Sequence, residues 1–152
     1  MASIRLLVVD DHEVARRGIR SVLGGNPNLE VVGEALDGEQ AVEKVRELRP
    51  DIVLLDITLP GISGIEAARM IREVSPESRI VFVSQHDSLG MAKEALQVAW
   101  CYVVKSDAGH DLLAAIEAAR ESRVFVSRTM VAHGWSPEKP DHTQPASIQK
   151  TL

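Results

Sequence analysis

Five polar residues stand directly after four apolar runs of the chain, and together their side chains could handle a phosphate group. They are Asp10, Asp11, Asp56, Ser84 and Lys105. If each apolar run is a buried parallel strand, all five side chains lie along one edge of one sheet. Three carboxylates this close together resist ionisation unless a cation joins them. A hard divalent cation with oxygen ligands would satisfy them, and Mg²⁺ is the usual ion where phosphate is handled.

The elements that would position these residues alternate between strand-like and helix-like segments. The expected strands cover residues 4–10, 29–35, 51–56, 79–84 and 101–104. The expected helices cover residues 13–23, 38–48, 64–74, 88–97 and 108–122. Helical spacing is clear where Ile65, Ala68 and Ile71 recur on one face, and Asp37 and Ser63 are suitable N-caps. Five strand-helix units predict an α/β fold, a doubly wound parallel sheet of five strands with five helices on its two faces.

The overall composition is that of a globular protein and excludes several classes. The chain has 152 residues, of which 45% are hydrophobic and 26% charged, which suits one domain with a single core. The net charge of −5 argues against direct nucleic-acid binding by this chain. No apolar stretch approaches the ~18 residues of a membrane span, and the N-terminus has no signal-peptide pattern. The single cysteine, Cys101, excludes an internal disulfide and suits a reducing cytoplasm.

The chain changes character after about residue 126. Residues 127–152 contain three prolines, several polar residues and few periodic apolar ones. This composition predicts one domain over residues 1–126, followed by a C-terminal linker or flexible tail over residues 127–152. Met130 and Trp135 are the side chains best suited to hold part of the tail against the domain.

At these separations the five polar residues resemble the site of a receiver domain of two-component response regulators. The resemblance extends from residue 4 to about residue 126. The segment 56–64, Asp-Ile-Thr-Leu-Pro-Gly-Ile-Ser-Gly, is similar to the phosphoacceptor segment of that family. Lys-Ser-Asp at 105–107, and His12 after the acidic pair, are typical of the subfamily that usually carries a C-terminal LuxR-type helix-turn-helix. The resemblance implies the flavodoxin-like strand order 2-1-3-4-5.

The resemblance also implies a chemical role for the acids and the lysine. Asp56 would be the nucleophile that accepts a phosphoryl group from a histidine kinase, a phosphotransfer protein or a small phosphodonor. Asp10 and Asp11 would hold Mg²⁺, or Mn²⁺ in its place. Asp56 and the backbone carbonyl of Thr58 would complete the metal site. Lys105 would pair first with Asp56 and then with a phosphoryl oxygen. The chain would be a cytoplasmic phosphoacceptor rather than an enzyme.

Two further residues would turn phosphorylation into a change of shape. Ser84 would donate its hydroxyl to a phosphoryl oxygen and move toward it, and Tyr102 would rotate inward as the family's aromatic switch. These movements would alter the face formed by the fourth helix, the fifth strand and the fifth helix, where a phosphorylation-dependent homodimer or another partner would bind. Thr58 and His86 occupy positions that in this family are thought to tune the lifetime of the phosphate.

Simpler interpretations remain open for several of these residues. The acidic pair could merely cap the helix that follows it. Tyr102 could be a half-buried aromatic residue, and His86 a surface histidine. Three positions also depart from the family pattern. Ser106 stands where many receivers have a cis proline, and Val98 and Cys101 stand where the subfamily usually has glycine.

Two alternatives concern the chain as a whole. Its tail is shorter than the roughly 60 residues of a helix-turn-helix module, so we expect either a stand-alone receiver that acts by protein contact or a piece of a longer transcriptional regulator. A Mg²⁺-dependent phosphatase of the haloacid dehalogenase type would also use an aspartate nucleophile at a strand end. That class needs a second acid two residues later as general acid/base, where Thr58 stands, so it is the weaker alternative.

Overall fold

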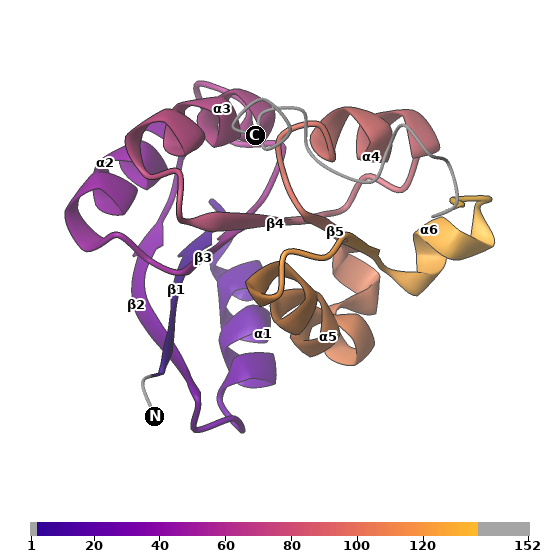
Figure 1. Ribbon diagram of the computed structural model, residues 1–152, viewed down its shortest axis with the longest axis horizontal. Coiled ribbons are helices and arrows are strands. Elements are labelled where there is room, and N and C mark those ends of the chain that lie inside the picture. Colours follow the sequence, from indigo (N-terminus) through magenta and orange to yellow (C-terminus); the bar gives the residue numbers. More distant parts are fainter. Residues whose placement is uncertain (1–2, 137–152) are drawn as a thin grey trace.

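The computed structural model describes residues 3–136, and its centre is one parallel sheet of six strands (Figure 1). The strands are β1 (Ile4–Val9), β2 (Leu29–Ala35), β3 (Ile52–Leu55), β4 (Arg79–Ser84), β5 (Cys101–Val104) and β6 (Phe125–Val126). They are arranged in the order β2-β1-β3-β4-β5-β6. Every neighbouring pair is parallel, so the C-terminal ends of all strands face the same edge of the sheet. The strand order switches between β1 and β3, where such folds bind their ligands.

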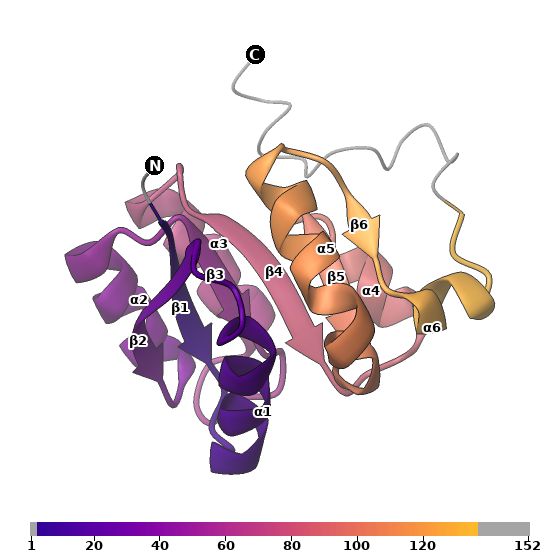
Figure 2. The same cartoon turned by 90° about the horizontal axis from the view of Figure 1, so that it is seen from below.

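Helices cover both faces of this sheet (Figures 1 and 2). They are α1 (Glu13–Leu23), α2 (Gly38–Leu48), α3 (Gly64–Val74), α4 (Leu89–Ala95), α5 (Ala108–Arg120) and α6 (Arg128–Ala132), with a 3-10 turn, η1 (Lys105–Asp107), before α5. Helices α1 and α5 lie on one face, whereas α2, α3 and α4 lie on the other. Leu6 and Val8 of β1 pack on the α1/α5 side, and Leu7 and Val9 pack on the opposite side. Because both faces are covered, the central strand β3 is apolar and buried throughout.

The starts of α2 and α3 are fixed by side-chain caps that the sequence predicts. The Asp37 carboxylate accepts a hydrogen bond from Gln40 N at 2.8 Å at the start of α2. The Ser63 hydroxyl accepts from Glu66 N at 3.1 Å at the start of α3. Each cap satisfies one of the free N–H groups of a first helical turn. The cap of α3 therefore fixes the end of the loop that begins at Asp56.

The five predicted strands and five predicted helices are confirmed, with ends that shift by one or two residues. The predicted order 2-1-3-4-5 is confirmed as well, and β6 extends the sheet beyond β5. Residues 127–136, the first part of the segment expected to be a linker or tail, lie against the domain with Met130 and Trp135 buried. Residues 137–152 of the expected tail lie outside the described residues, and the division into a domain and a linker stays a prediction. In the described part of the chain, every helix is too short or too polar to cross a membrane.

Residues 125–135, which we call the C-terminal strap, attach to β5 and to the start of α5. Ser127 N donates to Tyr102 O at 3.0 Å, and Val104 N donates to Ser127 Oγ at 2.9 Å. The N–H and hydroxyl of Thr129 donate to the Asp107 carboxylate at 2.9 and 2.8 Å. The strap therefore stabilises the C-terminal end of β5, which is directly followed by Lys105.

The second half of the strap is anchored by apolar burial. Met130 is fully buried and Trp135 is 8% exposed, and both join the core on the α4 side of the sheet. His133 Nδ1 lies 2.8 Å from Asp87 O in the loop before α4. A strand of two residues and a helix of five are too short to produce a hydrophobic period in the sequence. The two apolar anchors were the only sign that this segment folds.

Candidate functional site

The acidic pair lies in the turn from β1 to α1. Asp10 N donates to Ala35 O at 3.1 Å, which extends the pairing with β2 by one residue. The Asp10 side chain is 1% exposed and that of Asp11 is 29% exposed. His12 N donates to Asp10 Oδ1 at 2.9 Å, and His12 Nδ1 lies 3.2 Å from a carboxylate oxygen of each aspartate. His12, not an aspartate, is the N-cap residue of α1, so the helix start does not explain the acidic pair.

Asp56 follows β3 and is 3% exposed. Its N–H donates to Val9 O at 3.0 Å, and its carboxylate Oδ1 accepts from Ile57 N at 2.8 Å. The loop after it turns back so tightly that Gly64 N donates to Ile57 O. A Cβ at Gly64 would lie 1.9 Å from Asp56 O, a distance that no side chain tolerates. Gly64 is therefore required for α3 to approach the strand end that carries Asp56.

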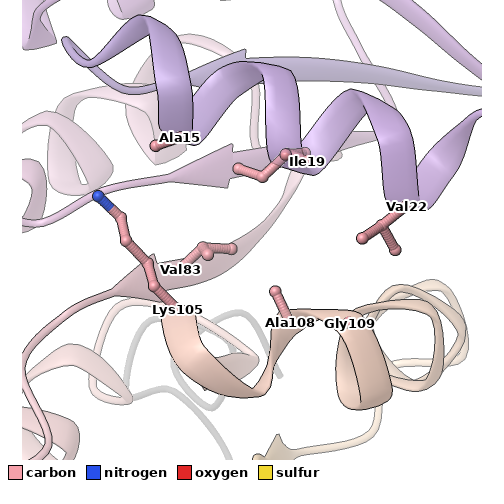
Figure 3. Close-up of a pocket in the computed structure, with 8 residues that line it drawn as sticks. Ala15, Ile19, Val22, Val83, Lys105, Ala108 and Gly109 are labelled. Atoms are coloured by element: carbon pink, nitrogen blue, oxygen red, sulfur yellow. The ribbon is translucent and has the colours of Figure 1, made fainter.

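Lys105 follows β5 and joins the two buried acids. Its Nζ lies 2.7 Å from Asp10 Oδ2 and 3.1 Å from Asp56 Oδ2. The stem of Lys105 borders a cavity of about 300 Å³ between α1 and α5 (Figure 3). Small or apolar residues line this cavity, among them Gly18, Ile19 and Ala108. The lysine thus runs along an apolar wall and carries its charge to the acids.

The pKa values of Asp56 and Lys105 are both raised, that of Asp56 mainly by burial and that of Lys105 by its contacts within the site. Burial raises the pKa of Asp56; the Lys105 ammonium opposes this shift, and the Asp10 charge supports it. Burial alone would lower the pKa of Lys105, but its hydrogen bond to Asp10 and the charges of both acids raise it overall. One ammonium therefore serves three carboxylates, counting Asp11, and an excess of negative charge remains.

The geometry of the acids suits a divalent cation. Ligand atoms of Asp10, Asp11, His12 and Asp56 all lie within 4.8 Å of one another. Asp11 Oδ1 is buried and accepts no hydrogen bond from the described residues, with His12 Nδ1 at 3.2 Å as its neighbour. A buried carboxylate oxygen without a donor normally has a large energetic cost. A hard cation bound by oxygen atoms removes that cost, so the residues present fit the Mg²⁺ that the sequence predicts.

The remaining predicted residues are linked by hydrogen bonds to His86, in the loop after β4. Ser84 is fully buried, and its Oγ accepts from His86 N at 3.1 Å. His86 Nε2 lies 2.7 Å from Thr58 Oγ1, across the edge of the site. The Tyr102 hydroxyl donates to His86 O at 2.8 Å. Tyr102 is fully buried, so it already has the inward orientation that the sequence associated with the switched state. Hydrogen bonds thus hold His86 from three sides.

The structure therefore joins the predicted site residues in two sets of contacts, the acids with Lys105 and the loop residues around His86, and it adds Arg16. Arg16 Nη1 donates to Asp10 O at 2.7 Å, and its side chain is 10% exposed. The helical pattern of α1 gave no reason to connect Arg16 with the site, because its bond to the site is made with a backbone carbonyl. The available signal was that Arg16 is a charged residue on the inner side of α1, the helix that follows the acidic pair.

A doubly wound sheet that gathers three acids and a lysine at its C-terminal edge defines a class of small α/β phosphate-handling domains. The family model of the response regulator receiver domain matches residues 6–117, and the chain belongs to this family. It is therefore a domain of two-component signal transduction, and the family consists of phosphoacceptors rather than enzymes.

Solved structures support the same assignment. The chain is 33% identical to a LuxR-family two-component response regulator from Aurantimonas sp. SI85-9A1, with a TM-score of 0.81 over 99% of this chain and 100% of that chain. It is 31% identical to the signal receiver domain of NarL from Mycobacterium tuberculosis, with a TM-score of 0.76 over 81% of this chain and 100% of that chain.

Curated relatives are longer than this chain. The transcriptional activator protein ExaE from Pseudomonas putida is 35% identical over 126 residues, which are 82% of this chain and 59% of that protein. The transcriptional regulatory protein LiaR from Bacillus subtilis is 38% identical over 117 residues, 76% of this chain and 56% of that protein. The chain thus spans little more than half the length of these two relatives.

Proposed function

We propose that this chain accepts a phosphoryl group on Asp56 from a histidine kinase or a phosphotransfer protein, and that a divalent cation, Mg²⁺ or Mn²⁺, is required. The observation that carries the proposal is the meeting of Asp10, Asp56 and Lys105 at the ends of β1, β3 and β5. Asp56 is nearly buried, faces an ammonium and lies at the switch in strand order. A carboxylate placed in this way is suited to attack phosphorus.

In the proposed reaction a carboxylate oxygen of Asp56 forms a bond to phosphorus while the bond from phosphorus to the donor's imidazole nitrogen breaks. The bond's electron pair leaves with the imidazole. Lys105 Nζ then exchanges Asp56 Oδ2, now 3.1 Å away, for a phosphoryl oxygen. When bound, the cation neutralises charge on the transferring group. Asp10 and Asp11 would hold it with Asp56, and the Thr58 carbonyl would supply a further ligand.

The pKa shifts are consistent with this chemistry. Asp56 must be ionised to attack, and burial raises its pKa, so its reactivity falls as the solution is acidified. Lys105 must be charged to stabilise the product, and its pKa is raised, so it stays charged through neutral and mildly alkaline pH. We propose that phosphoryl transfer is fastest at neutral to mildly alkaline pH.

The proposed switch runs through the loop that contains His86. To donate to a phosphoryl oxygen, the Ser84 hydroxyl would point its hydrogen toward Asp56, and a movement of Ser84 would draw along His86, whose N–H donates to Ser84 Oγ. The bonds of His86 to Thr58 and to Tyr102 would be remade at the same time. We propose that Thr58 and His86 also set the phosphate lifetime, because their side chains meet at the edge of the site. The altered surface would lie on α4, β5 and α5.

The output of this surface is proposed in two forms. In a stand-alone receiver it would bind a partner protein, pass the phosphate onward or form a phosphorylation-dependent homodimer. In a longer regulator it would control transcription through another domain, and the receiver itself would not contact nucleic acid. The second form is supported by the relatives ExaE and LiaR, whose names describe transcriptional regulators. Both forms act in the cytoplasm, where the kinase domain would meet the receiver.

The proposal is tested by incubating the chain with acetyl phosphate and Mg²⁺ and measuring the intact mass. We expect one phosphoryl group on the wild type and none on Asp56→Asn, while the exposed-acid control Glu47→Gln is labelled normally. Chelation of the divalent cation should abolish the labelling. Full labelling of Asp56→Asn would contradict the assignment. Many turnovers of a phosphomonoester per molecule would instead favour the phosphatase alternative.

A further inference from the structure

A cluster of charged side chains lies directly behind the acidic pair, and the proposed reaction gives it no role. It consists of Glu13 and Glu34 together with three arginines of α1, Arg16, Arg17 and Arg20. Arg16 lies at its centre with a side chain that is 10% exposed. Arginine is seldom buried to this extent unless all its charge is compensated. The position of Arg16 therefore has to be explained by what it contacts.

Three hydrogen bonds of Arg16 join three parts of the fold. Nη1 donates to Asp10 O at 2.7 Å, in the turn between β1 and α1. Nε donates to Glu34 Oε1 at 2.8 Å in β2, and Nη2 donates to Glu13 Oε1 at 2.5 Å in the first turn of α1. A guanidinium can make these bonds at once because its donors are fixed in one plane. Arg16 thereby connects the backbone of the turn that contains Asp10 and Asp11 to β2 and to the first turn of α1.

We propose that Arg16 is a positioning residue, which holds the turn of Asp10 and Asp11 in the geometry that binds the divalent cation. This inference rests on the proposed function. Arg16 acts on the shape of the turn, because its bond to the turn is made with the backbone carbonyl of Asp10 and not with a carboxylate of the site. Arg20 provides an internal control, since it also pairs with Glu34 but contacts neither Asp10 nor Asp11 in the bonds observed.

The test compares the affinity of the full chain for Mg²⁺ in three proteins: the wild type, Arg16→Met and Arg20→Met. Isothermal titration calorimetry gives the dissociation constant without any phosphorylation step. We expect Arg16→Met to bind Mg²⁺ about tenfold more weakly, because a charge-assisted hydrogen bond to the turn is lost. Arg20→Met should bind as tightly as the wild type or slightly more tightly, since it removes a nearby positive charge without releasing the turn.

A second readout separates positioning of the cation ligands from general damage. The labelling of Arg16→Met by acetyl phosphate should require more Mg²⁺ but approach the wild-type rate at saturating Mg²⁺. If Arg16→Met does not fold, Arg16→Lys answers the question, because lysine keeps the charge but cannot make all three bonds. We expect Arg16→Lys to bind Mg²⁺ more weakly than Arg20→Met.

The outcomes decide between this inference and the proposed function. Equal Mg²⁺ affinity in the wild type and the folded Arg16 variants would overturn the positioning role and leave the proposed function intact. Equal weakening in the Arg16 and Arg20 variants would also overturn it, because the effect would then belong to the charge cluster as a whole. A wild type that binds no Mg²⁺ and takes no label would refute the proposed function itself.

Discussion

The two halves of the site are built in different ways. The half formed by β1 and β3 contains Asp10, Asp11 and Asp56, and its charges are only partly compensated by Lys105. The half formed by β4 and β5 contains neutral groups whose hydrogen bonds are satisfied around His86. We therefore expect the acidic half to depend on a cation, and the neutral half to depend on packing and on hydrogen bonds that can be exchanged.

The residues that support the two halves from behind also differ: those behind the acidic half are charged, and those behind the neutral half are apolar. Behind the acidic half, Arg16 ties the turn to its neighbours through charged groups. Behind the neutral half, the C-terminal strap packs Met130 and Trp135 into the core beside α4. We therefore expect ions and pH to act mainly on the acidic half, and truncation of apolar side chains to act mainly on the stability of the neutral half.

The largest effect on stability is expected from the strap. Met130→Ala removes a fully buried side chain and should lower the free energy of unfolding by about 2–5 kcal/mol. Urea unfolding monitored by circular dichroism measures the loss. Val131→Ala, at a neighbouring position that is 55% exposed, should change it by less than about 0.5 kcal/mol. Equal losses in the two variants would show that the strap does not support the fold through burial.

The largest effect on chemistry is expected from the link between the halves. Lys105→Met removes the ammonium that contacts Asp10 and Asp56 and should slow labelling by acetyl phosphate about a hundredfold, as loss of a donor to a developing negative charge does. Lys93→Met, at an exposed lysine of α4, is the matched control and should label normally. If Lys105→Met is labelled as fast as Lys93→Met, Lys105 has no role in phosphoryl transfer.

A smaller effect is expected when Mg²⁺ is added without a phosphodonor. At ten times its dissociation constant the cation should stabilise the fold by about 1.4 kcal/mol, which thermal unfolding detects. Asp11→Asn should lose most of this gain, because Asp11 Oδ1 is a buried carboxylate oxygen that accepts no hydrogen bond from the described residues. Met130→Ala should keep the gain in full. If all three proteins respond alike, the cation acts elsewhere.

The smallest effect concerns Asp56 and pH. Its pKa is raised in the folded state, so the unfolded chain loses this proton first as the pH rises and the fold loses stability above the ordinary pKa. Asp56→Asn should therefore be more stable than the wild type at pH 7, by on the order of 1 kcal/mol. The difference should shrink as the pH falls toward 4. A variant that is less stable at pH 7 would mean that the Lys105 pair outweighs burial.

Most of the fold could be predicted from the sequence because its strands are buried on both faces and end in polar residues. That pattern located Asp10, Asp56 and Lys105 at one edge, since parallel strands share their C-terminal end. It did not reveal Arg16, because the bond of Arg16 to the site is made with the backbone carbonyl of Asp10, which has no sequence signature. Of the strap it indicated only the two anchors, Met130 and Trp135, because a two-residue strand has no period and is formed only by pairing with β5.

The most direct test of the central claim is to locate the phosphoryl group by reduction of the labelled chain with borohydride, followed by peptide mass spectrometry. Borohydride converts an aspartyl phosphate to homoserine, so the modified residue is identified without any substitution. The account predicts homoserine at position 56 and only when Mg²⁺ or Mn²⁺ was present. Homoserine at position 10 or 11, or a label that is independent of the cation, would contradict it.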